Sequence, residues 1–261
     1  LNNKRWGRIG GINGHGYNLT IGKDFLFDEH GYYGLLFDYG SNTVSGAAGS
    51  GEYDSYSLGL YAGNKNKPGS ITGFVSYGLQ ANKGTAYLPV LGQTAESGYD
   101  SKTLGIGVEY AYDLDYGKPE ELWHVSPYAR LNFTHYRQKA FREHGAGVFD
   151  RSFGSYSDNY AEGELGLSFD RSEGTGGYGI RLGYKRILAG ERQLMEVCFA
   201  EDECGSLLPV RSWGEGRNHF VAAAYVRHDF SRKWSAGGSL SGDWSNGGRE
   251  IGARLDLAYH F

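Results

Sequence analysis

Apolar and polar residues alternate strictly over residues 251–261, "IGARLDLAYHF". Read with a period of two residues, one face carries Ile251, Ala253, Leu255, Leu257, Tyr259 and Phe261. The residues between them, including Arg254 and Asp256, point to the opposite face. The pattern predicts a β-strand with one apolar face and one polar face.

The same alternation recurs along most of the chain and is clearest at 104–112 and 178–184. From Tyr17 onward it predicts eleven strands of roughly ten residues each, the length that crosses a bilayer at a tilt. Short connections such as "DEHG" and "RSEGTGG" alternate with long ones at 41–52, 82–101, 142–158 and 192–217. This asymmetry is typical of outer-membrane barrels, which have short periplasmic turns and long outer loops.

An even strand number requires one more strand near the N-terminus, because single-chain bacterial barrels close in an antiparallel manner. Residues 5–13, "RWGRIGGIN", are predicted to form this short twelfth strand. The alternative is that residues 1–16 are a linker remnant that threads the lumen, with the barrel formed by 17–261. The first residues contain no leader-like apolar segment, so we expect the chain to derive from a longer precursor.

Composition supports an all-β transmembrane barrel, because 43 Gly and 21 Tyr accompany only 5 Pro and 1 Met. A net charge of −4 gives no basic field, which argues against a nucleic-acid partner. Cys198 and Cys204 lie close together in "CFAEDEC" and are predicted to form a disulfide, the alternative being two surface thiols. Neither a metal site nor a cofactor is expected.

Several segments resemble the autotransporter β-domain, the C-terminal translocator of type V secretion. They are "EYDSYSLGLYAG", "GYDSKTLGIGVEYAYDL", "SPYARLNFTHYRQKAF" followed by "GAG", "DNYAEGELGLSFD" and "EIGARLDLAYHF". The resemblance spans nearly the whole chain. It implies a twelve-stranded barrel in a bacterial outer membrane, surrounded by lipid, that exports and anchors a covalently linked N-terminal passenger.

The resemblance also assigns a role to the last strand. Its alternating residues are similar to the signal that the barrel assembly machinery reads by strand addition. The residues concerned are Gly252, Leu255, Leu257, Tyr259 and Phe261. The same strand also serves simply as the closing strand of the barrel.

Two other functions were considered. A small porin-like or adhesin-like barrel would act through its own pore or loops. A barrel hydrolase would need paired groups at the outer rim, but the pairs Asp113 with Asp115 and His228 with Asp229 precede short turns. We therefore expect no enzymatic activity.

The remaining polar side chains are expected to be structural. His144 is interpreted as a solvated loop residue. The charged residues on the predicted lumen face are expected to pair with one another or to face water. They are Glu109, Glu164, Arg181, Lys185, Arg254 and Asp256.

Overall fold

The computed structural model of the protein describes residues 13–66, 68–89, 91–116, 123–190, 194–199, 208–211 and 216–259. Strands make up most of these residues. One short 3-10 turn, η2 (Gly147–Phe149), precedes Arg151. Within these ranges, no helix is long and apolar enough to cross a membrane.

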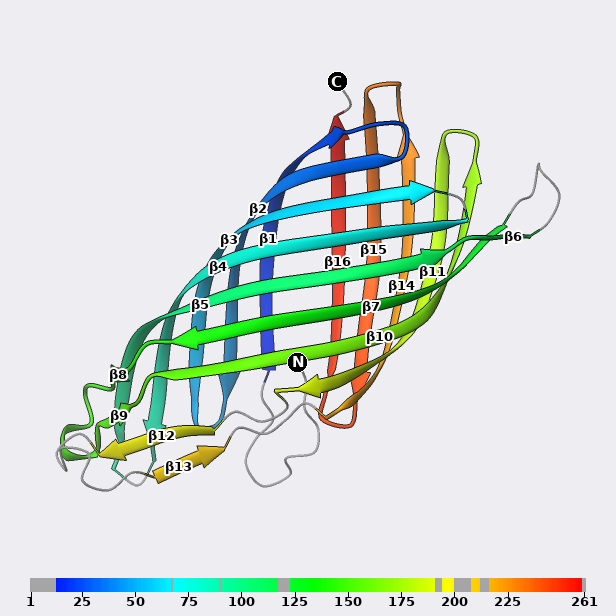
Figure 1. The fold of residues 1–261 in the computed structure, drawn as a ribbon. Helices are drawn as coiled ribbons and strands as arrows, with labels where there is room; N and C mark the ends of the chain where they lie inside the picture. Colours follow the sequence, from blue (N-terminus) through cyan, green and yellow to red (C-terminus); the bar gives the residue numbers. More distant parts are fainter. Residues whose placement is uncertain are drawn as a thin grey trace.

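Eleven long strands form one antiparallel sheet in which each strand pairs with the next long strand along the chain (Figure 1). The strands are β1 (Asn13–Leu26), β2 (Gly31–Gly46), β3 (Gly49–Asn66), β4 (Gly69–Leu88), β5 (Gln93–Tyr112), β7 (Trp123–Gln138), β10 (Tyr156–Glu173), β11 (Gly176–Ala189), β14 (Asn218–Asp229), β15 (Trp234–Ser245) and β16 (Arg249–Tyr259). A short strand, β6 (Leu114–Tyr116), extends the pairing along β7. The eleven predicted strands are all present.

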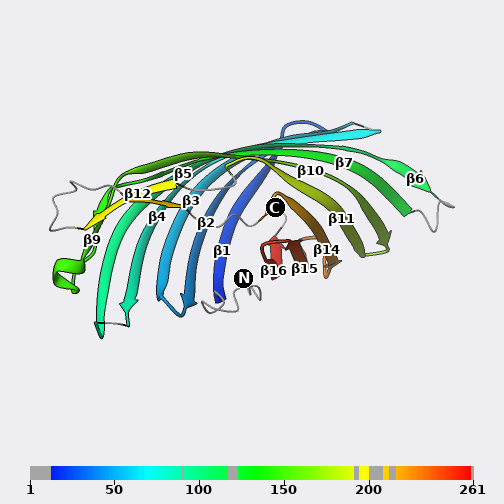
Figure 2. The ribbon, with the colours of Figure 1, turned by 90° about the horizontal axis from the view of Figure 1, so that it is seen from below.

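The sheet curls strongly, so that one face is concave (Figure 2). Among the residues that the structure describes, no backbone pairing joins β1 to β16, and these two strands are the edges of the sheet. The predicted twelfth strand at 5–13 lies outside the described residues except for Asn13, which begins β1. The first predicted strand therefore begins at Asn13, before Tyr17.

The two faces of the sheet differ in chemistry. The convex face exposes large apolar side chains on every long strand, among them Leu19, Leu58, Ile106, Leu131, Leu165, Ile180, Phe220, Leu240 and Leu255. Soluble proteins rarely expose a continuous apolar surface of this kind. An apolar band around a barrel is the surface that faces lipid.

The predicted long connections at 41–52 and 82–101 are mostly strand, which corrects the expectation of loops there. β2 and β3 continue their pairing to Gly46 and Gly49, and β4 and β5 continue to Leu88 and Gln93. Because each extension pairs with its neighbour, the backbone polar groups stay hydrogen-bonded without a loop. The strands are consequently 11 to 20 residues long rather than about ten.

The other two long connections contribute a second, smaller sheet at the same end of the main sheet (Figure 1). Its order is β13-β12-β9-β8, and its strands are β8 (Phe141–Arg142), β9 (Arg151–Phe153), β12 (Leu194–Phe199) and β13 (Leu208–Arg211). Phe141 stacks between Tyr99 of β5 and Phe153, with ring centroids 4.2 and 4.4 Å away. This stack fixes the small sheet to the end of the main one.

Candidate functional site

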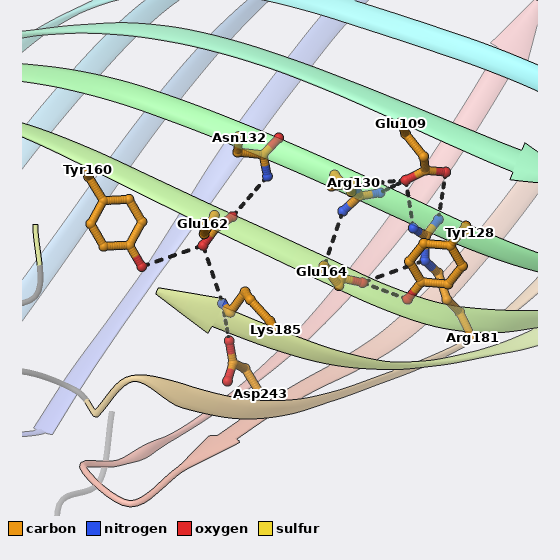
Figure 3. Close-up of polar contacts among 10 residues, drawn as sticks. All are labelled: Glu109, Tyr128, Arg130, Asn132, Tyr160, Glu162, Glu164, Arg181, Lys185 and Asp243. Atoms are coloured by element: carbon orange, nitrogen blue, oxygen red, sulfur yellow. Dashed lines mark hydrogen bonds and ion pairs between the residues drawn. The ribbon is translucent and has the colours of Figure 1, made fainter. Parts of the chain in front are cut away.

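The concave face carries a network of charged side chains from four consecutive strands of the sheet (Figure 3). Glu109 of β5 receives Arg130 of β7 and Arg181 of β11, each with a guanidinium nitrogen 2.6 Å from Oε2. Glu164 of β10 lies between the two arginines, 3.8 and 3.9 Å from their nearest nitrogens. Two carboxylates and two guanidiniums therefore balance each other inside the curled sheet.

Tyr128 of β7 lies beneath the Arg181 guanidinium, which contacts Glu109 across two intervening strands. In the sheet register Tyr128 lies opposite Gly166, which in turn lies opposite Gly183. A Cβ at either glycine would lie within 2.5 Å of the Tyr128 hydroxyl, so the ring occupies the space above both residues.

The Tyr128 ring is also a platform for the charges around it. Its hydroxyl donates a hydrogen bond to Glu164 at 2.6 Å, and the Arg181 guanidinium lies 3.5 Å from the ring centroid. The side chain is almost fully buried. A cation over a tyrosine face is stabilised by the ring quadrupole, so Tyr128 supports the network by both contacts.

A second cluster continues the network toward the β14–β15 hairpin (Figure 3). Lys185 of β11 contacts Asp243 of β15 and lies 3.9 Å from Glu162 of β10. The Asn132 amide of β7 donates to Glu162 at 2.8 Å. These contacts connect the successive strands β7, β10 and β11 and reach β15 across the intervening β14.

His219 completes this cluster on β14. The ring is buried, with Nδ1 2.7 Å from Asp243 and Nε2 3.2 Å from the Gly216 carbonyl oxygen. Both ring nitrogens therefore have a polar partner. The histidine anchors the chain where it returns from the smaller sheet to β14.

A cavity of about 360 Å³ lies beside the first cluster, on the concave face. Its lining joins charged groups of the network to small residues of β14, β15 and β16, and includes Tyr128, Arg130, Glu164, Arg181, Ala222, Ser241 and Gly252. The cavity therefore combines apolar surface with charged groups, most of which are already paired.

The predicted lumen charges are paired in the structure, as expected. Glu109, Glu164, Arg181 and Lys185 belong to the two clusters, and Arg254 pairs with Asp256 on β16. Four of their partners, and His219 as a partner of Asp243, were not predicted from the sequence. The four are Tyr128, Arg130, Glu162 and Asp243. Their parity was a usable signal, since Tyr128 and Arg130 alternate with the outward Leu131 and Phe133.

The residues considered for hydrolysis are not brought together. Asp113 accepts a hydrogen bond from Ser126 at 2.9 Å, whereas His228 packs edge-on against Phe230 and Asp229 pairs with Arg227. Three strands, β7, β10 and β11, lie between the two locations, a separation on the order of 19 Å at the usual strand spacing. The side chain of Asp115 lies outside the described part of the chain.

His144 is exposed, as predicted for a loop residue, but its backbone forms a bridge with Glu96 through hydrogen bonds of 2.8 and 2.9 Å. The described residues contain no group of three His, Cys, Asp or Glu side chains that would hold a metal ion. Cys198 is buried, with Sγ 3.6 Å from the Ser152 carbonyl oxygen. Cys204 lies outside the described residues, so the disulfide stays a prediction.

The C-terminal strand β16 shows the predicted two faces. Leu255 and Leu257 project outward and are 92% and 70% exposed, and Tyr259 packs edge-on against Trp234 of β15. Gly252 lies opposite Ser241 on the concave side. Phe261 lies outside the described residues. The role of these five residues as an assembly signal stays a prediction.

A family model described as "Autotransporter beta-domain" matches residues 1–241. The chain belongs to this family. It is therefore an outer-membrane translocator domain, which implies a linked N-terminal passenger and confirms the resemblance seen in the sequence.

Solved structures agree on the fold. The translocator domain of the autotransporter NalP from Neisseria meningitidis matches with a TM-score of 0.79 at 18% identity, over 97% of this chain and 82% of that one. The transport unit of the autotransporter AIDA-I from Escherichia coli matches with a TM-score of 0.70 at 13% identity, over 100% and 87%. The β-domain of the Bordetella autotransporter BrkA matches with a TM-score of 0.62 at 13% identity, over 96% and 91%. No curated protein matches the chain in sequence.

The Tyr128 contact gives a testable consequence for stability. We expect Gly166→Ala to destabilise the folded protein by about 1–3 kcal/mol, because the new Cβ would lie 2.3 Å from the Leu182 carbonyl oxygen and 2.4 Å from the Tyr128 hydroxyl. Gly98→Ala is the matched control, since its nearest neighbour would be 3.9 Å away. The free energies of unfolding are compared by urea titration in lipid vesicles. Equal values for the two variants would show that the Gly166 contact is unimportant.

Proposed function

We propose that this domain inserts into the outer membrane and lets its N-terminal passenger cross along the inside of the curled sheet. It then anchors the passenger without any catalytic step. Family membership supports export and anchoring. The observation that carries the proposal is the division of the sheet into an apolar convex face and a polar, internally paired concave face. Such a wall suits a passive conduit.

The pairing on the concave face matters for passage. A passenger segment inside the barrel would meet guanidiniums and carboxylates that already hold partners, including Glu109 with Arg130 and Arg181. Exchanging one ion pair for another in a wet lumen changes the free energy little. The wall would therefore hold a passing chain only weakly.

Closure of the barrel requires one further strand, and we assign this role to residues 5–13. β1 and β16 run in the same direction, because eleven strands are joined by successive antiparallel pairings (Figure 1). An inserted strand running the opposite way would pair antiparallel with both edges. Residues that immediately precede Asn13 and turn into β1 would have this direction.

The C-terminal strand is proposed to guide assembly. The outward residues of β16 are among the most exposed apolar side chains of the sheet, and β16 lies at an edge. An edge strand offers unpaired backbone groups to a partner, and alternate side chains supply specificity. We therefore infer that Gly252, Leu255, Leu257, Tyr259 and Phe261 are read by the barrel assembly machinery before the barrel closes, and that outer-membrane lipids then surround the convex face.

The transport proposal is tested with a reporter domain fused before Leu1, behind a signal peptide. We expect protease added to intact cells to digest most of the reporter, because the passenger end is carried outside. Heat-modifiable gel mobility of the barrel is the control for folding. A folded barrel whose reporter stays protected in the periplasm would contradict export and favour the porin-like alternative.

The assembly proposal predicts a position-specific effect. We expect Leu255→Ser with Leu257→Ser to reduce the folded fraction in cells several-fold, because strand recognition loses its side chains. Leu58→Ser with Leu60→Ser on β3 is the control, since these leucines are also outward and 59% and 50% exposed. Refolding of purified protein into detergent should be similar for both variants. Equal losses in cells would mean that only lipid contact is affected.

The closing strand is tested by single cysteines at each of residues 5–13, in a background with Cys198→Ser and Cys204→Ser. A strand should give labelling by a water-soluble maleimide at every second position, because its side chains alternate between lumen and lipid. Leu19→Cys and Thr20→Cys on β1 give the reference labelling for a lipid-facing and a lumen-facing position. Uniform labelling across 5–13 would instead indicate a segment inside the lumen.

A further inference from the structure

Two cations face outward from adjacent strands near the end of the main sheet that bears β8 and β9. Lys102 of β5 and Arg137 of β7 lie directly opposite each other in the sheet register. Both share the parity of the outward Leu104 and Phe133, and both are exposed. Directly opposed residues have Cβ atoms only about 5 Å apart, so two positive charges are held side by side.

The surroundings do not neutralise this pair. The neighbouring outward positions are Leu79 and Ala81 on β4 and Ser157 and Asn159 on β10. Asp100, the next outward residue on β5, carries a carboxylate, but the Lys139 ammonium already contacts it at 2.8 Å. The Lys139 ammonium holds the pKa of Asp100 below its usual value, and Lys102 adds to this effect. Among the described residues, no ion pair is formed by Lys102 or Arg137.

The position relative to the apolar band identifies the ligand. Lys102 and Arg137 lie where the outward apolar positions of β5 and β7 end, toward the end of β7 from which the chain continues into β8 of the smaller sheet. With the long connections facing outward, as is typical of outer-membrane barrels, the pair lies at the level of the headgroups of the outer leaflet. Like charges at this spacing repel unless an anion lies between them.

We propose that Lys102 and Arg137 bind a phosphate group of the outer-leaflet glycolipid, of the lipid A class. The inference rests on the insertion into the outer membrane given in the proposed function and adds a specific lipid site to it. Arg137 offers a planar fork that matches phosphate oxygens, and Lys102 supplies a second charge from the adjacent strand. His135, the outward residue that precedes Arg137 on β7, lies beside the site. Its Nδ1 is 2.9 Å from the Asn159 side chain.

The test measures lipid binding to the full chain refolded in detergent, by native mass spectrometry, with lipid A, dephosphorylated lipid A and phosphatidylglycerol as probes. We expect lipid A to bind best. Lys102→Gln with Arg137→Gln should weaken lipid A binding roughly tenfold or more, because two charge-assisted contacts are lost. The charge-preserving exchange Lys102→Arg with Arg137→Lys should retain most of the binding.

Two controls keep the outcome decisive. Lys23→Gln with Lys233→Gln removes the same charge near the opposite end of the sheet and should leave lipid A binding unchanged. Heat-modifiable mobility shows that each variant is folded. Equal weakening by both double variants, or equal binding of lipid A and phosphatidylglycerol, would overturn the site. Reporter export is measured separately, so loss of export with lipid A binding intact would count against the transport proposal alone.

Discussion

The constraint on which this structure depends is that backbone N–H and C=O groups have no water to bind inside a bilayer. A sheet satisfies them only by pairing every strand with a neighbour. The continuous path from β1 to β16 does this for all interior strands and leaves two edges. Because those two edge strands run in the same direction, a closing strand that pairs antiparallel with both must run in the opposite direction.

Curvature then determines what the concave face contains. Side chains on that face converge, so small residues such as Gly166 and Gly183 leave space that Tyr128 fills. Above this ring, Arg181 reaches Glu109 across two intervening strands. Each partly exposed ion pair contributes little stability by itself. Their combined effect is a lumen wall whose charges are matched before anything enters it.

The period-two pattern was enough to predict the eleven strands and the two faces of most of them, because β geometry places every second side chain on one side. It left the facing of "NHFVAAAYVRHDF" ambiguous. It overestimated the loops at 41–52 and 82–101, where Ser, Thr and charged residues mostly replace the apolar outward residues although the strands continue. It also missed the smaller sheet formed by β8, β9, β12 and β13. Arg181 and Glu109 are 72 residues apart, and only the register of the intervening strands brings them together.

The same residue types have different roles on the two faces. Arg130 and Arg181 project inward and meet carboxylates, whereas Arg137 projects outward beside Lys102 and has no acidic partner within the described part of the chain. Seven positions separate Arg130 from Arg137, an odd number, so one strand carries both environments. A slip of β7 by one residue would expose Arg130 to lipid and place Arg137 in the lumen. The ion pairs of Arg130 with Glu109 and Glu164 therefore also favour the observed register of the strand.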